Sequence, residues 1–290
     1  MGLLVVGVVA VSFAAPLIRL ADAPPLVVAF YRNLLATALL LPPALLLRRE
    51  ELRSLNRRDT SALVVAGLLL AIHFSAWIPS VTLTTVAAST VLVATTPVWA
   101  AVGSRLLLGE RVPGRATAGI AVAVLGAVII SGADVAISAR AFAGDALALA
   151  GAISAAGYLL AGRRLRQRRS LLVYAVVVYA VCSAALLVAI LITGTPLGGY
   201  PARSWLMFAL LAVGPQILGH TIFNYLLGDV SATVIAVAVM GEPVGASILA
   251  FALFGESPSL IAAAGGVLIL AGIYVAVSAQ SRTAAEAPVE

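Results

Sequence analysis

The sequence is short of charge, lysine, cysteine and histidine. Only 10% of its 290 residues are charged, the basic residues are all arginine, and there are one cysteine and two histidines. Without lysine, neither Schiff-base catalysis nor a P-loop can be built. A single cysteine forms no disulfide within the chain and no cysteine-based metal site, so Cys182 is expected to be a small buried apolar residue.

Catalytic motifs are also missing. The sequence contains no H-E-x-x-H, G-x-S-x-G, G-x-G-x-x-G or C-x-x-C pattern. The pI is about 10.1, but the arginines fall in short runs without interleaved aromatic residues, which argues against nucleic-acid binding. We therefore expect no catalytic residue, no metal, no cofactor and no nucleic-acid partner.

Apolar residues dominate what is present. They make up 62% of the chain and the mean hydropathy is +1.11, whereas soluble proteins have roughly 45–50% apolar residues. This composition predicts an all-α integral membrane protein embedded in a lipid bilayer. Gly2–Leu20 is long enough to span and is expected to be an uncleaved first helix. The expected spans are 2–20, 26–47, 61–80, 85–107, 115–133, 145–164, 170–193, 204–226, 231–253 and 260–279.

The arginines predict the orientation of these ten spans. Most of them fall in loops that follow even-numbered spans, and cytoplasmic loops retain positive charge. We therefore expect a multi-pass protein of the plasma (inner) membrane with both termini in the cytoplasm. The arginines on this side are Arg48, Arg49, Arg53, Arg57, Arg58, Arg105, Arg111, Arg115, Arg163, Arg164, Arg166, Arg168, Arg169 and Arg282. The opposite side has Arg19, Arg140 and Arg203.

The two halves of the chain resemble each other at an offset of 146 residues. The match predicts a first five-helix repeat over residues 1–134, a second over 135–279 and a disordered cytoplasmic tail over 280–290. Five is an odd number, so the second repeat must enter the membrane from the other side, as in many transporters. Identical pairs include Pro97/Pro243, Gly109/Gly255, Glu110/Glu256, Gly119/Gly265 and Gly126/Gly272.

Three segments are similar to a known family. They are "FYRNLLATALLLPPALLLRRE" (30–50), "HFSAWIPSVTLTTVAASTVLVATTPVWAAVGSRLLLGERV" (73–112) and "GHTIFNYLLGDVSATVIAVAVMGEPVGASILAFALFGE" (219–256). They resemble the drug/metabolite transporter superfamily, in particular its EamA-type ten-helix members. The resemblance implies a secondary transporter with two EamA-like repeats, a central cavity lined mostly by spans 1–4 and 6–9, and spans 5 and 10 at the periphery.

Glu242 is the charged residue that the expected spans explain least. It lies in the middle of span 231–253 beside Pro243, which removes a backbone donor, and its small neighbours permit either close helix packing or an open cavity. A charge at the bilayer centre costs roughly 2.5–3.5 kcal/mol, so Glu242 is interpreted either as a substrate-binding or proton-coupling carboxylate or as a structural contact. The matching residue of the first repeat is Thr96, and Pro97 and Pro243 are expected to be hinges or helix breaks.

Other polar residues fall inside the expected spans. Gln216, His220 and Asn224 are spaced four apart, which predicts a polar stripe on one helix face and a place in the cavity wall. His73 and Trp77 are interpreted as a gate or as packing, and the inverted repeat predicts that His73 and His220 lie toward opposite leaflets.

Arg32 has two interpretations. It lies about two turns inside span 26–47, so its side chain could snorkel to the membrane interface or contact an anionic ligand.

We therefore expect a secondary active transporter that exports small metabolites or drugs by alternating access, coupled to protons or driven by exchange. The alternatives are a passive facilitator or channel and, less favoured, a membrane-embedded lipid-modifying enzyme. The sequence favours a non-enzyme with a small-molecule substrate. Glycines of spans 5 and 10 are expected to bury helix contacts, within the chain or between chains, and both oligomeric states stay open.

Overall fold

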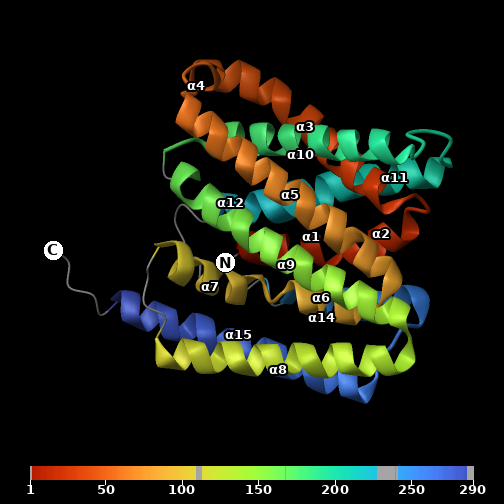
Figure 1. The fold of residues 1–290 in the computed structure, drawn as a ribbon. Helices are drawn as coiled ribbons and strands as arrows, with labels where there is room; N and C mark the ends of the chain where they lie inside the picture. Colours follow the sequence, from red (N-terminus) through yellow and green to blue (C-terminus); the bar gives the residue numbers. More distant parts are fainter. Residues whose placement is uncertain (1, 109–112, 167, 227–238, 240, 286–290) are drawn as a thin grey trace.

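The computed structural model describes residues 2–108, 113–166, 168–226, 239 and 241–285, and this part of the chain contains helices and no strand. The helices form a bundle in which successive connections alternate between two ends (Figure 1). The helices are α1 (Gly2–Ser12), α2 (Ala14–Leu20), α3 (Pro25–Leu47), α4 (Arg49–Arg53), α5 (Arg57–Leu83), α6 (Val86–Val93), α7 (Thr96–Leu108), α8 (Gly114–Ile137), α9 (Ala139–Arg166), α10 (Leu171–Thr193), α11 (Ala202–Leu211), the π-helix η1 (Ala212–Thr221), α12 (Ile222–Leu226), α14 (Gly241–Phe254) and α15 (Leu260–Ala285).

These helices confirm the expected membrane architecture. Seven described segments are long and apolar enough to cross a membrane, and three shorter apolar helices, 114–129, 241–254 and 260–276, add to them. Each of these segments falls within or over one of the ten expected spans. Helix α15 continues to Ala285 and so enters the segment 280–290 that was expected to be a tail. Residues 109–112 and 231–238, which include Glu110 and Arg111, lie outside the described residues.

Proline explains where two of the expected spans are divided. Pro16 has no N–H and its ring opposes the carbonyl of Ser12, and α1 ends at Ser12. The fourth span is divided between α6 and α7, and Pro97 is the second residue of α7. The carbonyl of Val93, which cannot bond to Pro97, accepts a hydrogen bond from Oγ1 of Thr96 at 2.7 Å. The threonine hydroxyl thus satisfies a backbone group inside the membrane.

A π-helix interrupts the eighth span. The segment 212–221 of η1 contains Pro215, and Oγ1 of Thr221 donates to the carbonyl of Gln216, five residues earlier, at 3.0 Å. π-Helices are rare and are found mostly as single-turn bulges at functional sites. The wider turn changes which residues share a face, so the four-residue spacing of Gln216, His220 and Asn224 does not describe a straight α-helical stripe.

The two ends of the bundle differ in charge. Helix α4, the 168–170 connection and the start of α8 lie at the end on the left of Figure 1, and we call this the arginine-rich end. The connections 21–24, 194–201 and 255–259 lie at the other end, which we call the arginine-poor end. The alternation of the loops therefore gathers the arginines at one end, as the sequence predicted.

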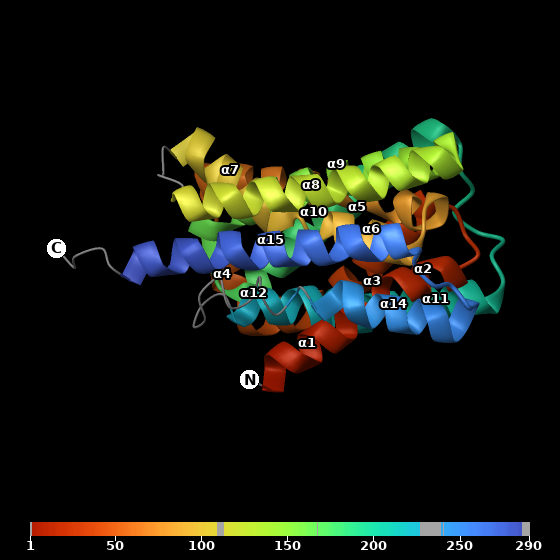
Figure 2. The same ribbon diagram turned by 90° about the horizontal axis from the view of Figure 1, so that it is seen from below.

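Glycines bring α8 and α15 together at the edge of the bundle, where the two helices lie side by side (Figures 1 and 2). A Cβ atom on Gly119 would lie 2.5 Å from the backbone nitrogen of Ala276 and 2.6 Å from the carbonyl oxygen of Gly272. A Cβ atom on Gly126 would lie 2.6 Å from the carbonyl oxygen of Gly265. The glycines of spans 5 and 10 thus pack against each other within the chain.

The pattern of these contacts reveals the symmetry of the fold. Gly119 meets Gly272 and Gly126 meets Gly265, so the two helices are antiparallel. Under the 146-residue match, Gly119 corresponds to Gly265 and Gly126 to Gly272, so each contact is the repeat copy of the other. A twofold axis that relates the repeats therefore passes between α8 and α15, which is the geometry of an inverted repeat.

We predict that Gly119→Leu destabilises the protein strongly. The new side chain would clash with the backbone of α15, and overpacking costs roughly 1–3 kcal/mol or more because backbone cannot move aside as a side chain can. The melting temperature of the purified protein in detergent measures the effect. Gly114→Leu is the control, because a Cβ there meets nothing within 4 Å. Equal melting temperatures for the two variants would contradict the tight α8–α15 contact.

Candidate solute-binding site

Arg32 is fully buried in the bundle. Its side chain has 0% exposure, and its Nε donates a hydrogen bond to Oε1 of Gln216 in η1 at 2.6 Å. The guanidinium carbon lies 4.3 Å from the ring centroid of Phe74 in α5, which is a cation–π contact. Its two terminal nitrogens, Nη1 and Nη2, have no hydrogen-bond partner. Snorkelling is therefore wrong for Arg32: its side chain turns into the protein and joins three helices.

Glu242 is an acidic residue within electrostatic range of Arg32. The two side chains interact electrostatically, although neither a hydrogen bond nor an ion pair joins them within the described part of the chain. Glu242 lies in the first described turn of α14, and its neighbours pack tightly on α1. A Cβ atom on Gly241 would lie 2.8 Å from Val8, and one on Gly245 would clash with Oγ of Ser12. The small residues around Glu242 thus serve close helix packing.

The contact with α1 also gives the depth of Glu242. Val8 and Ser12 flank the middle of the apolar segment Gly2–Leu20. Because Gly241 and Gly245 pack against them, Glu242 lies near the middle of that segment. Pro243, the third residue of α14, is buried.

The two histidines both lie beside Phe74. The ring centroids of His73 and Phe74 are 4.8 Å apart, and those of His220 and Phe74 are 6.2 Å apart. The expectation that the histidines lie toward opposite leaflets is therefore wrong. The reason is that His73 lies two thirds of the way along α5, and His220 lies near the end of η1, where the two helices cross at one level.

His73 and Trp77 pack between α5 and α9. Their rings are stacked at a centroid distance of 5.8 Å, and Nδ1 of His73 lies 2.9 Å from the carbonyl oxygen of Gly151. A Cβ atom on Gly151 would lie 3.1 Å from Cβ of Trp77, so the glycine lets α9 approach closely. These contacts favour a packing role for the pair.

The expected polar stripe is distributed over several helices. Gln216 holds Arg32 of α3, whereas Nδ2 of Asn224 donates to the hydroxyl of Tyr158 in α9 at 3.0 Å. His220 is partly buried, and the other two are buried. The structure therefore brings Arg32, Gln216 and His220 together around Phe74, with Glu242 within electrostatic range of Arg32, whereas Asn224 bonds Tyr158 of α9.

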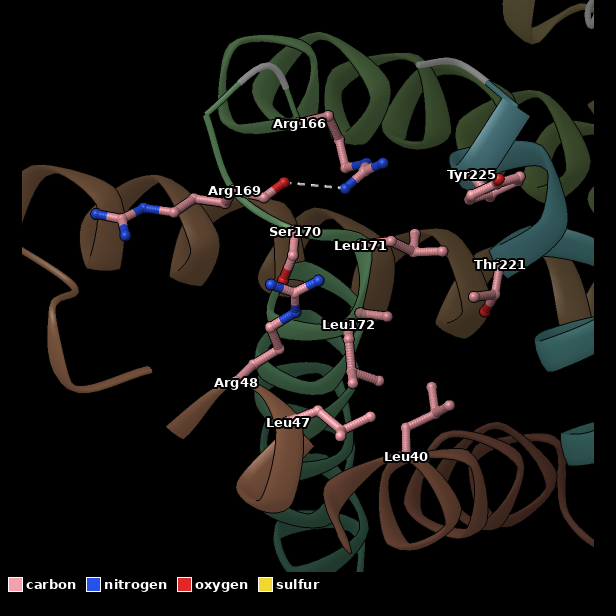
Figure 3. A pocket seen from close by; sticks show the side chains of 11 residues that line it. Leu40, Leu47, Arg48, Arg166, Arg169, Ser170, Leu171, Leu172, Thr221 and Tyr225 are labelled. Atoms are coloured by element: carbon pink, nitrogen blue, oxygen red, sulfur yellow. Dashed lines mark hydrogen bonds between the residues drawn. The ribbon is translucent and has the colours of Figure 1, made fainter. Parts of the chain in front are cut away.

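A cavity of about 750 Å³ lies between these residues and the arginine-rich end. Figure 3 shows the side chains of Arg48 and Arg166 on one part of the lining and leucine side chains on another, whereas the Arg169 side chain points away and forms a salt bridge with Asp59. Nη1 of Arg166 donates to the carbonyl of Arg169 at 3.0 Å. The lining residues are Leu40, Leu47, Arg48, Arg166, Arg169, Ser170, Leu171, Leu172, Ala175, Thr221 and Tyr225.

Thr221 connects the cavity with Arg32. It lines the cavity, and its Oγ1 lies 2.9 Å from the hydroxyl of Tyr179 and 3.0 Å from the backbone oxygen of Gln216. Gln216 in turn holds Arg32. Thr221 and Tyr225 were not selected from the sequence, although they too are spaced four apart, one residue beyond His220 and Asn224. Phe74 was also missed, because nothing in the sequence distinguishes a site-lining phenylalanine from the other apolar residues of a membrane span.

An ion pair closes the arginine-poor end. Arg19 of α2 forms a salt bridge with Glu256 in the α14–α15 connection, and its Nε donates to the carbonyl of Val81 in α5 at 2.7 Å. Oε1 of Glu256 accepts a hydrogen bond from the backbone N–H of Val86 at 2.6 Å. These contacts tie α2, α5 and α6 to the α14–α15 connection, and we call them the Arg19–Glu256 latch.

Aromatic side chains fill the same end between α3 and α11. The ring of Tyr31 stacks on that of Phe208 at 5.1 Å and meets Trp205 at 4.7 Å, measured between centroids. Its hydroxyl donates to the carbonyl of Leu197 at 2.8 Å. Arg32 therefore lies between a closed end and the cavity.

A family comparison identifies this arrangement of two repeats. The model of the EamA-like transporter family matches residues 1–132 and again residues 142–278. The chain belongs to the EamA-like transporter family. Members of the EamA-like family are transporters of small solutes in membranes, so the chain is a multi-pass membrane protein of that class. One match falls in each half of the chain.

A structural comparison agrees with the EamA-like assignment at the level of the fold. One solved crystal structure superimposes with a TM-score of 0.66 over 94% of this chain and 95% of that chain. The two sequences are 19% identical. No curated protein matches the sequence.

We predict that Arg19→Gln opens the arginine-poor end. Loss of the charge-assisted hydrogen bonds that join α2 to α5 and to the α14–α15 connection should raise the accessibility of a cysteine at the buried position Val81 by about tenfold. Labelling of Val81→Cys by a membrane-impermeant maleimide measures this change. Native Cys182 is buried, and protein without the added cysteine gives the background.

Arg203→Gln is the matched control, because Arg203 is an exposed arginine at the same end. If Arg19→Gln and Arg203→Gln label Val81→Cys at the same rate, the Arg19–Glu256 latch does not hold this end closed.

Proposed function

We propose that the protein is a secondary active transporter that exports small metabolites or drugs across the plasma membrane by alternating access. The arginine-rich end then faces the cytoplasm, because positive charge is retained there. The observation that carries this proposal is the position of Arg32, Gln216, His220 and Glu242 between a closed end and a cavity at the other end.

The inverted repeat supports alternating access. Two repeats related by a twofold axis in the membrane plane can exchange conformations, which turns a site open to one side into a site open to the other. In the conformation described here the arginine-poor end is closed by the Arg19–Glu256 latch. On the proposed orientation, this is a state in which the cavity communicates with the cytoplasm.

Glu242 is the residue that we propose for proton coupling. It is an acid near the middle of the bundle, it interacts with the Arg32 charge, and the repeat-related residue is Thr96. The His220 ring packs edge-on against Phe74, whose ring also contacts the Arg32 guanidinium, and His220 is a candidate proton relay. Exchange of one solute for another without a proton is the second mode of coupling that fits these residues.

A transport assay separates this function from its two alternatives. The probes are amino acids, sugars, monocarboxylates and cationic drugs, selected first by their ability to raise the melting temperature of the purified protein. Flux in proteoliposomes that saturates and is stimulated by solute on the far side indicates a carrier. Linear flux without such stimulation would indicate a channel or facilitator. A chemically altered product without any gradient would indicate an enzyme.

We predict that Glu242→Gln abolishes flux driven by a pH gradient. The amide cannot release or take up the proton, whereas solute exchange at equal pH should continue. The measurement is initial flux of a stabilising probe in proteoliposomes, with and without a pH gradient.

Glu50→Gln makes the same change at an exposed acid of α4 and should behave as wild type. An unchanged response of Glu242→Gln to the gradient would refute the coupling role of Glu242 and leave exchange as the mechanism.

A further inference from the structure

We propose that the free edge of the Arg32 guanidinium binds the carboxylate group of the transported solute. This inference rests on the proposed transport function and names the class of substrate. The solute is a small molecule that carries a single carboxylate next to an apolar or weakly polar body.

The first support is the unused hydrogen-bonding capacity of Arg32. A guanidinium has five N–H donors, and only Nε is engaged, by Gln216. Arg32 has 0% exposure, so neither the described part of the protein nor bulk water satisfies Nη1 and Nη2. Unpaired donors on a buried charge are costly, and each is expected to be satisfied by something that binds there.

The second support is that the residues around Arg32 hold the guanidinium in one orientation. Gln216 fixes Nε on one edge, and the Phe74 ring lies 4.3 Å from the guanidinium carbon. These contacts leave the edge formed by Nη1 and Nη2 as the part of the group still available for two parallel hydrogen bonds. A carboxylate has two oxygens at the spacing that this edge recognises.

The third support is the balance of charge. Arg32 carries one positive charge, and Glu242 is already close enough to interact with it. A dianion such as a phosphate would leave excess negative charge in a buried site, which is unfavourable in a low dielectric. When Glu242 holds the proton proposed for its coupling role, a carboxylate monoanion needs only the one cation that Arg32 provides.

The cavity provides the route and the space for the rest of the solute. Leu40 lines the cavity and lies eight residues from Arg32 on α3, or about 12 Å along the helix. Thr221 in the cavity wall donates to the backbone oxygen of Gln216, whose side chain accepts the hydrogen bond from Arg32. The leucines in the wall (Figure 3) suit an apolar body. Such a body would extend toward the arginine-rich end from a carboxylate held by Arg32.

Matched pairs of acids and amides test this proposal by binding alone. The probes are benzoate, phenylacetate and leucine, each compared with benzamide, phenylacetamide and leucinamide, and the measurement is the melting temperature of the purified protein against probe concentration. We expect at least one acid to stabilise the wild-type protein and its amide to have no effect. We expect Arg32→Gln to weaken that acid's binding roughly 10- to 100-fold, as for the loss of charge-assisted hydrogen bonds.

Two further variants separate loss of binding from loss of folding, since Arg32→Gln could fail to fold. Gln216→Glu has nearly the same shape and supplies Arg32 with an internal carboxylate, so it should fold and should also weaken binding of the acid. Arg53→Gln removes an exposed arginine of α4 and should bind the acid as wild type does. Stabilisation of the wild type by no acid in the set, or equal stabilisation in Gln216→Glu and wild type, would overturn the proposal.

Flux measurements distinguish a failure of this proposal from a failure of the proposed function. Saturable flux of uncharged or cationic probes that Gln216→Glu leaves unchanged would overturn carboxylate recognition and retain the transporter. Stabilisation by an acid that is lost in Gln216→Glu, without flux of any probe, would retain the binding site and overturn transport.

Discussion

The burial of the Arg32 guanidinium is the constraint on which the centre of the structure depends. A charge in an apolar bundle is costly, so the surrounding helices must supply contacts for it. Gln216 in η1 binds Nε, Phe74 in α5 covers one face, and Glu242 in α14 lies within electrostatic range. The two contacts come from different helices, and so one side chain joins α3, η1 and α5. The same burial leaves the two terminal nitrogens of Arg32 without a hydrogen-bond partner among the described residues.

The helices around Arg32 are related by the approximate twofold symmetry of the two repeats, whereas the polar residues near Arg32 do not obey this symmetry. The reciprocal contacts of Gly119 with Gly272 and Gly126 with Gly265 place a twofold axis between α8 and α15. In contrast, Glu242 corresponds to Thr96 in the other repeat, and Thr96 bonds its own helix at the carbonyl of Val93. Duplication thus accounts for the packing of the helices, whereas the charged centre belongs to the second repeat and to Arg32. Such a division suits a carrier, because symmetric halves can exchange conformations around one binding site.

Part of the centre could be read from the sequence, and part could not. Arg32, Gln216, His220 and Glu242 are detectable because a polar residue in an apolar span is costly wherever it lies. Their mutual contacts are not detectable, because the sequence of one span does not indicate which other helices pack against it. The π-helix 212–221 also changes the spacing on which the polar stripe was based. The two histidines were expected to lie far apart, yet both lie beside Phe74, since η1 and α5 cross at the same level.

The sequence by itself determined the class of protein, the positions of its membrane spans, the repeat and the end where arginines gather. These features follow from composition and periodicity, which act locally because each apolar segment must satisfy its own backbone in lipid. Only the tertiary structure decided that Arg32 turns inward, that Arg19 and Glu256 close one end, and that Thr221 lies in the cavity wall. Each of these depends on contacts between segments far apart in the chain, and the geometry of such contacts is fixed only when the helices pack.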